Sequence, residues 1–135
     1  MSVPSTFFKI NRLKEKVTVT FKRLPKDDDE FQLFLDGLSS LYATKTKFSM
    51  LFDTRGLGTV QLPQKYRTKL GEWIDTNRPF AEKYLGSTAV VIQSTIVRIF
   101  VKFLIRFHPP SSPLEFYSTP RECLQYLQWT RKKKV

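Results

Sequence analysis

Residues 48–58 read Phe48-Ser-Met-Leu-Phe-Asp53-Thr-Arg-Gly-Leu-Gly58, an apolar run that passes directly into a polar turn punctuated by glycine. The apolar part, residues 48–52, has the length of a strand and predicts a buried one. After Pro63 the apolar residues recur at spacings of three and four, which predicts an amphipathic helix. A buried strand, a tight turn and a helix in this order favour an α/β fold.

The same alternation extends in both directions from this stretch. Upstream, residues 7–12 and 17–21 predict a β-hairpin, and a helix at 28–43 follows with Asp27 to Asp29 as N-cap candidates. Downstream, a short turn at 80–85 leads to a strand at 88–92, a very apolar helix at 95–107, a strand at 114–117 and a helix from Pro120. The predicted order is β-β-α-β-α-β-α-β-α, a mixed and mostly parallel sheet whose antiparallel edge is the N-terminal hairpin.

The composition predicts one domain with a large positive charge. The chain has 135 residues, with 23 Lys and Arg against 12 Asp and Glu, which gives a formal net charge of +11. We expect residues 1–130 to form the domain and residues 131–135 to form a basic C-terminal tail. One Cys excludes a disulfide within the chain, and one His excludes the common multi-histidine metal sites, so we expect neither metal nor cofactor.

The N-terminal residues lack the apolar core and cleavage site of a secretory signal. Residues 89–107 contain no acid, but basic residues and the polar Gln93-Ser94-Thr95 lie inside them. A strand followed by a helix therefore explains this segment better than a transmembrane span. We expect no transmembrane helix, and a cytoplasmic or nucleocytoplasmic protein.

The element order and the run Asp53-Thr54-Arg55-Gly56-Leu57-Gly58 resemble the STAS domain, the fold of anti-sigma factor antagonists of the SpoIIAA type. In that family the loop reads Asp-Ser-Ser-Gly-Leu-Gly, opens the second helix and carries a serine that a partner kinase phosphorylates. Here Thr54 replaces the first serine, and Arg55 stands at the position of the phosphorylated one. The resemblance therefore implies a STAS-like fold that is not switched by phosphorylation at the usual position.

The loop at 53–58 is the first candidate site, because open α/β sheets bind ligands where parallel strands end. A non-enzymatic protein-interaction module in a regulatory or structural assembly is the expected function, and its partner remains unidentified. The partner-binding residues would be Asp53, Thr54, Arg55, Gly56 and Gly58. The alternative is that the two glycines only permit a tight turn, which Asp53 caps.

A basic stripe on the helix at 95–107 is the second candidate site. Arg98, Lys102 and Arg106 are each four residues apart, so they lie in one row on that helix. With the tail residues Arg131, Lys132, Lys133 and Lys134 they would bind an anionic surface, either nucleic acid without sequence specificity or acidic lipid. Phe100, Phe103 and Phe107 would then face acyl chains or a protein partner.

The helix at 95–107 also has three alternative roles. A core-packed helix with one solvated edge is the simplest, homodimerisation through its apolar surface is the second, and a small hydrophobic ligand held beneath it is the third.

The side chains usual in catalysis are few, and we expect no enzyme activity. His108 precedes Pro109-Pro110 at a helix end, where a C-terminal capping role is expected. Cys123 lies among apolar helix positions and is expected in the core. The acids at 27–30 lack EF-hand spacing, and a helix N-terminus accounts for them.

Overall fold

The computed structural model describes residues 2–3, 7–59 and 61–129, and it contains one six-stranded sheet in the order β1-β2-β3-β4-β5-β6. The elements are β1 (Ser2–Val3), β2 (Phe8–Leu13), β3 (Lys16–Phe21), α1 (Asp28–Ala43), β4 (Phe48–Asp53), the 3-10 turn η1 (Arg55–Leu57), α2 (Gln64–Thr76), α3 (Arg78–Tyr84), β5 (Leu85–Val91), α4 (Thr95–Phe107), β6 (Leu114–Tyr117) and α5 (Pro120–Leu127). The basic tail predicted at 131–135 lies outside the described residues.

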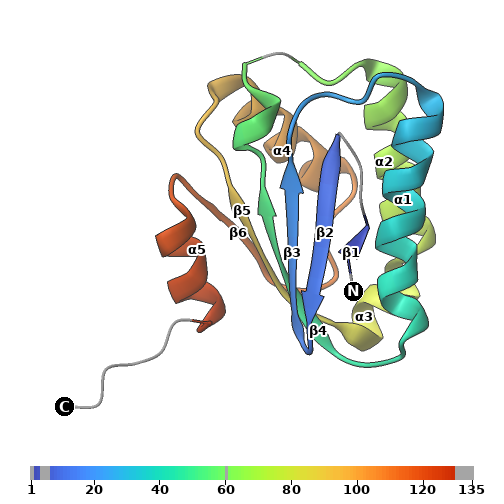
Figure 1. Ribbon diagram of the computed structural model, residues 1–135, viewed down its shortest axis with the longest axis vertical. Helices are drawn as coiled ribbons and strands as arrows, with labels where there is room; N and C mark the ends of the chain where they lie inside the picture. The colour runs from blue at the N-terminus through green and yellow to red at the C-terminus, as the bar shows by residue number, and fades with distance from the viewer. Residues whose placement is uncertain (1, 4–6, 60, 130–135) are drawn as a thin grey trace.

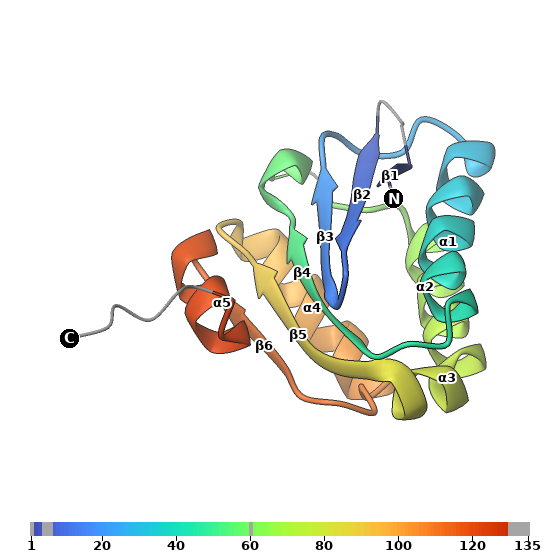
Figure 2. The ribbon, with the colours of Figure 1, turned by 60° about the horizontal axis from the view of Figure 1, so that its bottom comes forward.

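The pairing confirms the predicted fold class. Strands β1, β2 and β3 are antiparallel, and β3, β4, β5 and β6 are parallel in sequential order. Each parallel crossover moves one strand further along the sheet, so crossovers of the usual right hand place their helices on the same face. Helices α1 to α4 indeed lie on one side of the sheet, and α5 lies alone on the other (Figures 1 and 2). This arrangement is consistent with STAS-like topology.

Three elements differ from the predicted ones. The two-residue strand β1, which pairs antiparallel with β2, was not predicted. Residues 78–84 form the helix α3 rather than a short turn, because Pro79 stands in its first turn, where a missing N–H costs nothing. Strand β5 begins at Leu85, three residues before the expected start, and Ser87 N–H there donates to Ser49 Oγ at 3.0 Å. This bond lies beside the register shift between Phe48 and Met50 in the β4–β5 pairing.

Side-chain caps hold the starts of three helices. Asp27 accepts from Glu30 N–H at 3.0 Å at the start of α1, and Thr119 accepts from Glu122 N–H at 3.2 Å at the start of α5. Ser94 accepts from Val97 N–H at 3.3 Å at the start of α4. His108 stands at the C-cap position, as expected, but only its backbone N–H bonds to the helix, at the Leu104 carbonyl, and its ring pairs with Asp75. No helix among the described residues is both long enough and apolar enough to cross a membrane.

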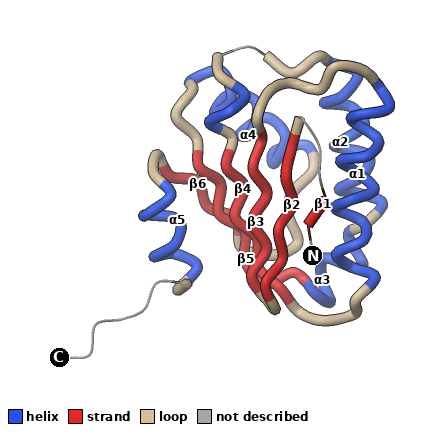
Figure 3. The backbone as a smooth tube through the Cα atoms, in the orientation of Figure 1, coloured by secondary structure: helices blue, strands red, loops and turns tan. Residues whose placement is uncertain are grey.

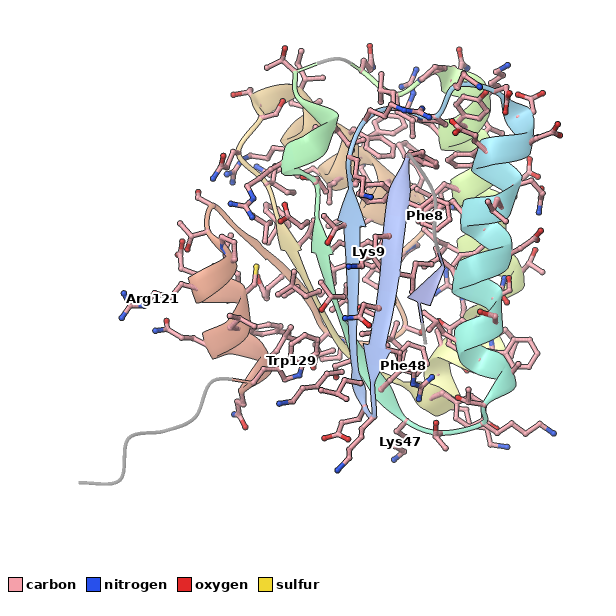
Figure 4. All side chains as sticks on the ribbon, viewed as in Figure 1. Phe8, Lys9, Lys47, Phe48, Arg121 and Trp129 are labelled. Carbon is pink, nitrogen blue, oxygen red and sulfur yellow. The ribbon has the colours of Figure 1, made fainter. Side chains whose placement is uncertain are left out.

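Side chains alternate between the two faces of the central strands, as strand geometry requires. On β4, Met50 and Phe52 pack on the side of α1 to α4, whereas Leu51 packs under α5. On the side covered by α5, the sheet continues past β3 to β2 (Figure 3), where Lys9 and Asn11 are exposed. Figure 4 labels Lys9. The main core therefore lies between the sheet and helices α1 to α4.

Cys123 lies on α5 and is fully buried, as expected, and burial raises the pKa of its thiol to about 11. At about pH 8 only about one thiol in a thousand is then ionised, and a thiol reagent in solution cannot reach the buried sulfur. We expect Ellman's reagent to leave Cys123 unmodified in the native protein and to titrate one thiol after unfolding in guanidinium. Native labelling as fast as that of the denatured chain would show that α5 does not stay on the sheet.

Candidate functional site

The loop at 53–58 is built around an ion pair between Asp53 and Arg55. The Arg55 guanidinium donates to both carboxylate oxygens, from Nε to Oδ1 at 2.9 Å and from Nη2 to Oδ2 at 2.7 Å. Arg55 N–H also donates to Oδ1 at 3.1 Å. These bonds from Arg55 hold the pKa of Asp53 below its usual value. The Arg55 side chain remains 45% exposed, so its guanidinium group reaches the surface although it is paired with Asp53.

The other predicted residues of this loop shape the backbone. Thr54 is buried, and its hydroxyl donates to the Val91 carbonyl at 2.6 Å, which joins the ends of β4 and β5. A Cβ on Gly56 would lie 2.9 Å from Lys22 Cα and closer still to the Phe21 carbonyl oxygen. Gly58 has a φ of +66°, which favours glycine. Only Arg55 presents an exposed charged group here, and the partner-binding role of this loop stays a prediction.

The basic stripe lies on α4 as the spacing predicts. Lys102 and Arg106 are exposed, and Arg98 is half-buried with its guanidinium carbon 5.7 Å from the centre of the Phe116 ring. Arg131, Lys132, Lys133 and Lys134 lie outside the described residues. The structure therefore places three of the seven predicted anion-binding residues, and they form one row.

The apolar residues of α4 divide between two sides. Val97 and Val101 are buried against the sheet, and the half-buried Phe100 packs with them. Phe103 and Phe107 are 60% and 58% exposed. The expectation that Phe100 shares an outward side with them is wrong, because the Phe100 ring packs with the two valines in the cluster against the sheet. Helix α4 is thus packed on the core along one side, as the simplest of its three expected roles requires, and apolar residues form part of its exposed side.

A cavity of about 200 Å³ lies between the sheet and helices α1 to α4. Its lining is mostly apolar and comes from every surrounding element. Met50, Phe52 and Val90 come from the sheet, and Phe34, Leu70 and Val101 come from α1, α2 and α4 respectively. The cavity thus lies beneath the helix at 95–107, where a hydrophobic ligand was one of the sequence-based alternatives.

One end of this cavity carries polar groups, Asn77, Arg78 and His108. Asp75 lies behind them and pairs with His108 Nδ1 at 2.8 Å and with Arg78 Nη2 at 3.2 Å. Arg78 Nη1 also donates to the Pro109 carbonyl. The hydrogen bond from His108 lowers the pKa of Asp75, so this carboxylate stays ionised.

Sequence reasoning missed this polar cluster. His108 stands 33 residues from Asp75, and its ring packs against Gly71 of α2, where a Cβ would come within 2.7 Å of His108 Cδ2. Pairings between residues so distant in sequence depend on where the helix ends meet. The only available signal was a histidine at a helix end, which indicated a cap.

The described residues contain no cluster of three or more His, Cys, Asp and Glu side chains that would hold a metal ion. Comparison with models of protein families and with curated proteins finds no match for this chain. The resemblance to the STAS domain thus stays a prediction as far as family membership is concerned.

Proposed function

We propose that this protein binds a small apolar or amphiphilic molecule in the cavity between the sheet and helices α1 to α4. The observation that carries the proposal is the cavity itself, with about 200 Å³ of mostly apolar space. An engineered apolar cavity of about 150 Å³ in another protein is sufficient to bind benzene. The space here is larger than that cavity, so it suits an alkyl chain or an aromatic molecule.

Packing energetics support an occupant. Protein interiors are close-packed, and voids larger than a water molecule are few. Empty apolar space lowers the stability of a folded protein, because the side chains that line it lose packing contacts. Water gains little there, because most of the lining offers no hydrogen-bond partner. An apolar molecule would recover part of this cost through dispersion contacts.

The polar end of the cavity favours an amphiphile over a hydrocarbon. Arg78, His108 and Asn77 supply nitrogen groups to a lining whose other polar side chains include the hydroxyls of Thr54, Thr88 and Ser111. Tyr42 also lines the cavity and remains an uncharged phenol, because burial raises its pKa to about 12. A single chain with a hydroxyl or carboxyl head therefore matches the distribution of polarity.

The test measures binding of N-phenyl-1-naphthylamine, a neutral probe that fluoresces in apolar surroundings, and its displacement by decanol or decanoate. Val101→Phe fills the cavity from α4, and Ala81→Leu fills it from α3. We expect each variant to bind the probe at least tenfold more weakly and to unfold at a higher temperature, because a filled void stabilises the free protein.

Ile99→Phe is the matched control, since it enlarges an exposed side chain of the same helix. It should bind the probe like the wild type. Equal probe affinity in the wild type and both filled variants would overturn the proposal, as would the absence of any fluorescence enhancement. Native mass spectrometry of the purified protein should in addition reveal a retained ligand.

A further inference from the structure

A second feature of α4 lies on its outward side, away from the cavity. Four large apolar side chains form one row there, with Ile96, Ile99, Phe103 and Phe107 exposed by 41%, 62%, 60% and 58%. Their spacings of three, four and four keep them in line along the helix. The Phe103 and Phe107 rings touch, with centroids 4.6 Å apart. Single exposed apolar residues are ordinary, but a continuous row marks an interaction surface.

The basic stripe runs directly beside this apolar row. Arg98, Lys102 and Arg106 follow the same helix, and the Arg106 guanidinium carbon lies 5.8 Å from the centre of the Phe107 ring. Within the part of the chain that the structure describes, none of these three side chains forms an ion pair. Residues 95–107 contain no acid. The outward surface of α4 thus combines apolar side chains with uncompensated positive charge.

We propose that this surface docks on a lipid bilayer that contains anionic headgroups. A helix with aromatic and aliphatic residues along one side and Lys and Arg along the neighbouring side is typical of interfacial binding. The apolar row would enter the boundary between headgroups and acyl chains, while the basic side chains stay among the headgroups. The net charge of +11 adds attraction to an anionic surface.

Charge complementarity favours a bilayer over two other occupants. A second copy of this chain would bring another acid-free helix from a molecule of the same charge, so no ion pair would offset the repulsion. Nucleic acid would neutralise the basic stripe, but its phosphates would leave the apolar row facing a polar surface. The inference does not rest on the proposed function, because it uses the outer side of α4 and not the cavity.

The test is co-sedimentation with phosphatidylcholine vesicles prepared with and without phosphatidylserine. The wild type should sediment with the phosphatidylserine vesicles and lose binding as salt rises. Lys102→Gln/Arg106→Gln should weaken binding roughly 30-fold, since each basic residue near the membrane contributes about fivefold. Phe103→Ser/Phe107→Ser should weaken it at least as much, with an unchanged unfolding temperature because both rings are exposed.

Lys9→Gln/Lys47→Gln is the matched control. It removes the same charge from two exposed lysines at β2 and before β4, outside α4 (Figure 4). This variant should lose far less affinity than the α4 variants. An equal loss would show that net charge alone drives binding and would overturn the proposal.

Two other results would also overturn it. One is a wild-type dimer in light scattering that Phe103→Ser/Phe107→Ser converts to a monomer, with no vesicle binding by either. The other is binding to RNA, without vesicle binding, that depends on Lys102 and Arg106 and not on the phenylalanines. Binding of the fluorescent probe in the cavity is measured separately, without vesicles. Failure of the docking proposal therefore leaves the ligand proposal standing, and failure of the ligand proposal leaves the docking proposal standing.

Discussion

Gly56→Ala is expected to destabilise the protein by about 3 kcal/mol, at the upper end of the usual cost of overpacking. The new Cβ would lie 2.7 Å from the Phe21 carbonyl carbon and 2.9 Å from Lys22 Cα. Both atoms belong to the backbone, so no side-chain rotation relieves the clash. The turn η1 must instead move away from the end of β3.

Gly86→Ala is the control for this prediction. A Cβ on Gly86 would lie 2.8 Å from Ser49 Oγ, a side-chain atom that rotation can move. We expect a cost of about 1 kcal/mol or less, since the lost hydrogen bond to Ser87 is the main penalty. Urea unfolding followed by circular dichroism measures both variants. Equal midpoints for the two would contradict the close approach at Gly56.

The fold was largely predictable because local signals and periodicity agree along this chain. Helix α1 begins after Asp27 and α4 ends before the Pro109-Pro110 pair, both at the predicted residues. Each boundary depends on a cap or a breaker within a few residues, which the sequence displays directly. The buried strand β4, predicted from its compact apolar run, and the mostly parallel order followed from the same kind of evidence.

The surface of α4 could not be predicted to the same degree. This helix has apolar residues on two sides, and periodicity alone does not say which side meets the sheet. The choice depends on β5 and β6, whose Val90 and Phe116 pack with Val97 and Val101. Ile99 and Phe103 are consequently left outside.

The candidate sites show a similar division. The 53–58 loop was predicted at the end of a strand, as observed, but Gly56 was expected to permit a tight turn. The structure shows instead a close approach to β3. The cavity escaped detailed prediction because its lining combines side chains from helices and strands far apart in sequence.

Phe34→Ala is also expected to have a large effect and to lower the free energy of unfolding by about 3–5 kcal/mol. Phe34 is buried, and its ring lies 5.8, 5.4, 5.2 and 5.8 Å from those of Phe7, Phe8, Phe21 and Phe31 respectively. Truncation removes the centre of this aromatic cluster and enlarges the cavity that Phe34 lines. Urea unfolding should report the loss directly.

Leu33→Ala provides the comparison, because Leu33 is the neighbouring residue of α1 and is 44% exposed. Its cost should stay within about 0.5 kcal/mol. Decanol should then raise the unfolding midpoint of Phe34→Ala at least as much as that of the wild type, since a ligand that binds only the folded state stabilises it by mass action. A small cost for Phe34→Ala would contradict the assignment of the aromatic cluster as the core. Phe34→Ala leaves more apolar space for decanol than the wild type does. A large loss of stability in this variant, with no rise of its unfolding midpoint in decanol, would therefore show that the aromatic cluster stabilises the fold but that the cavity does not bind this ligand.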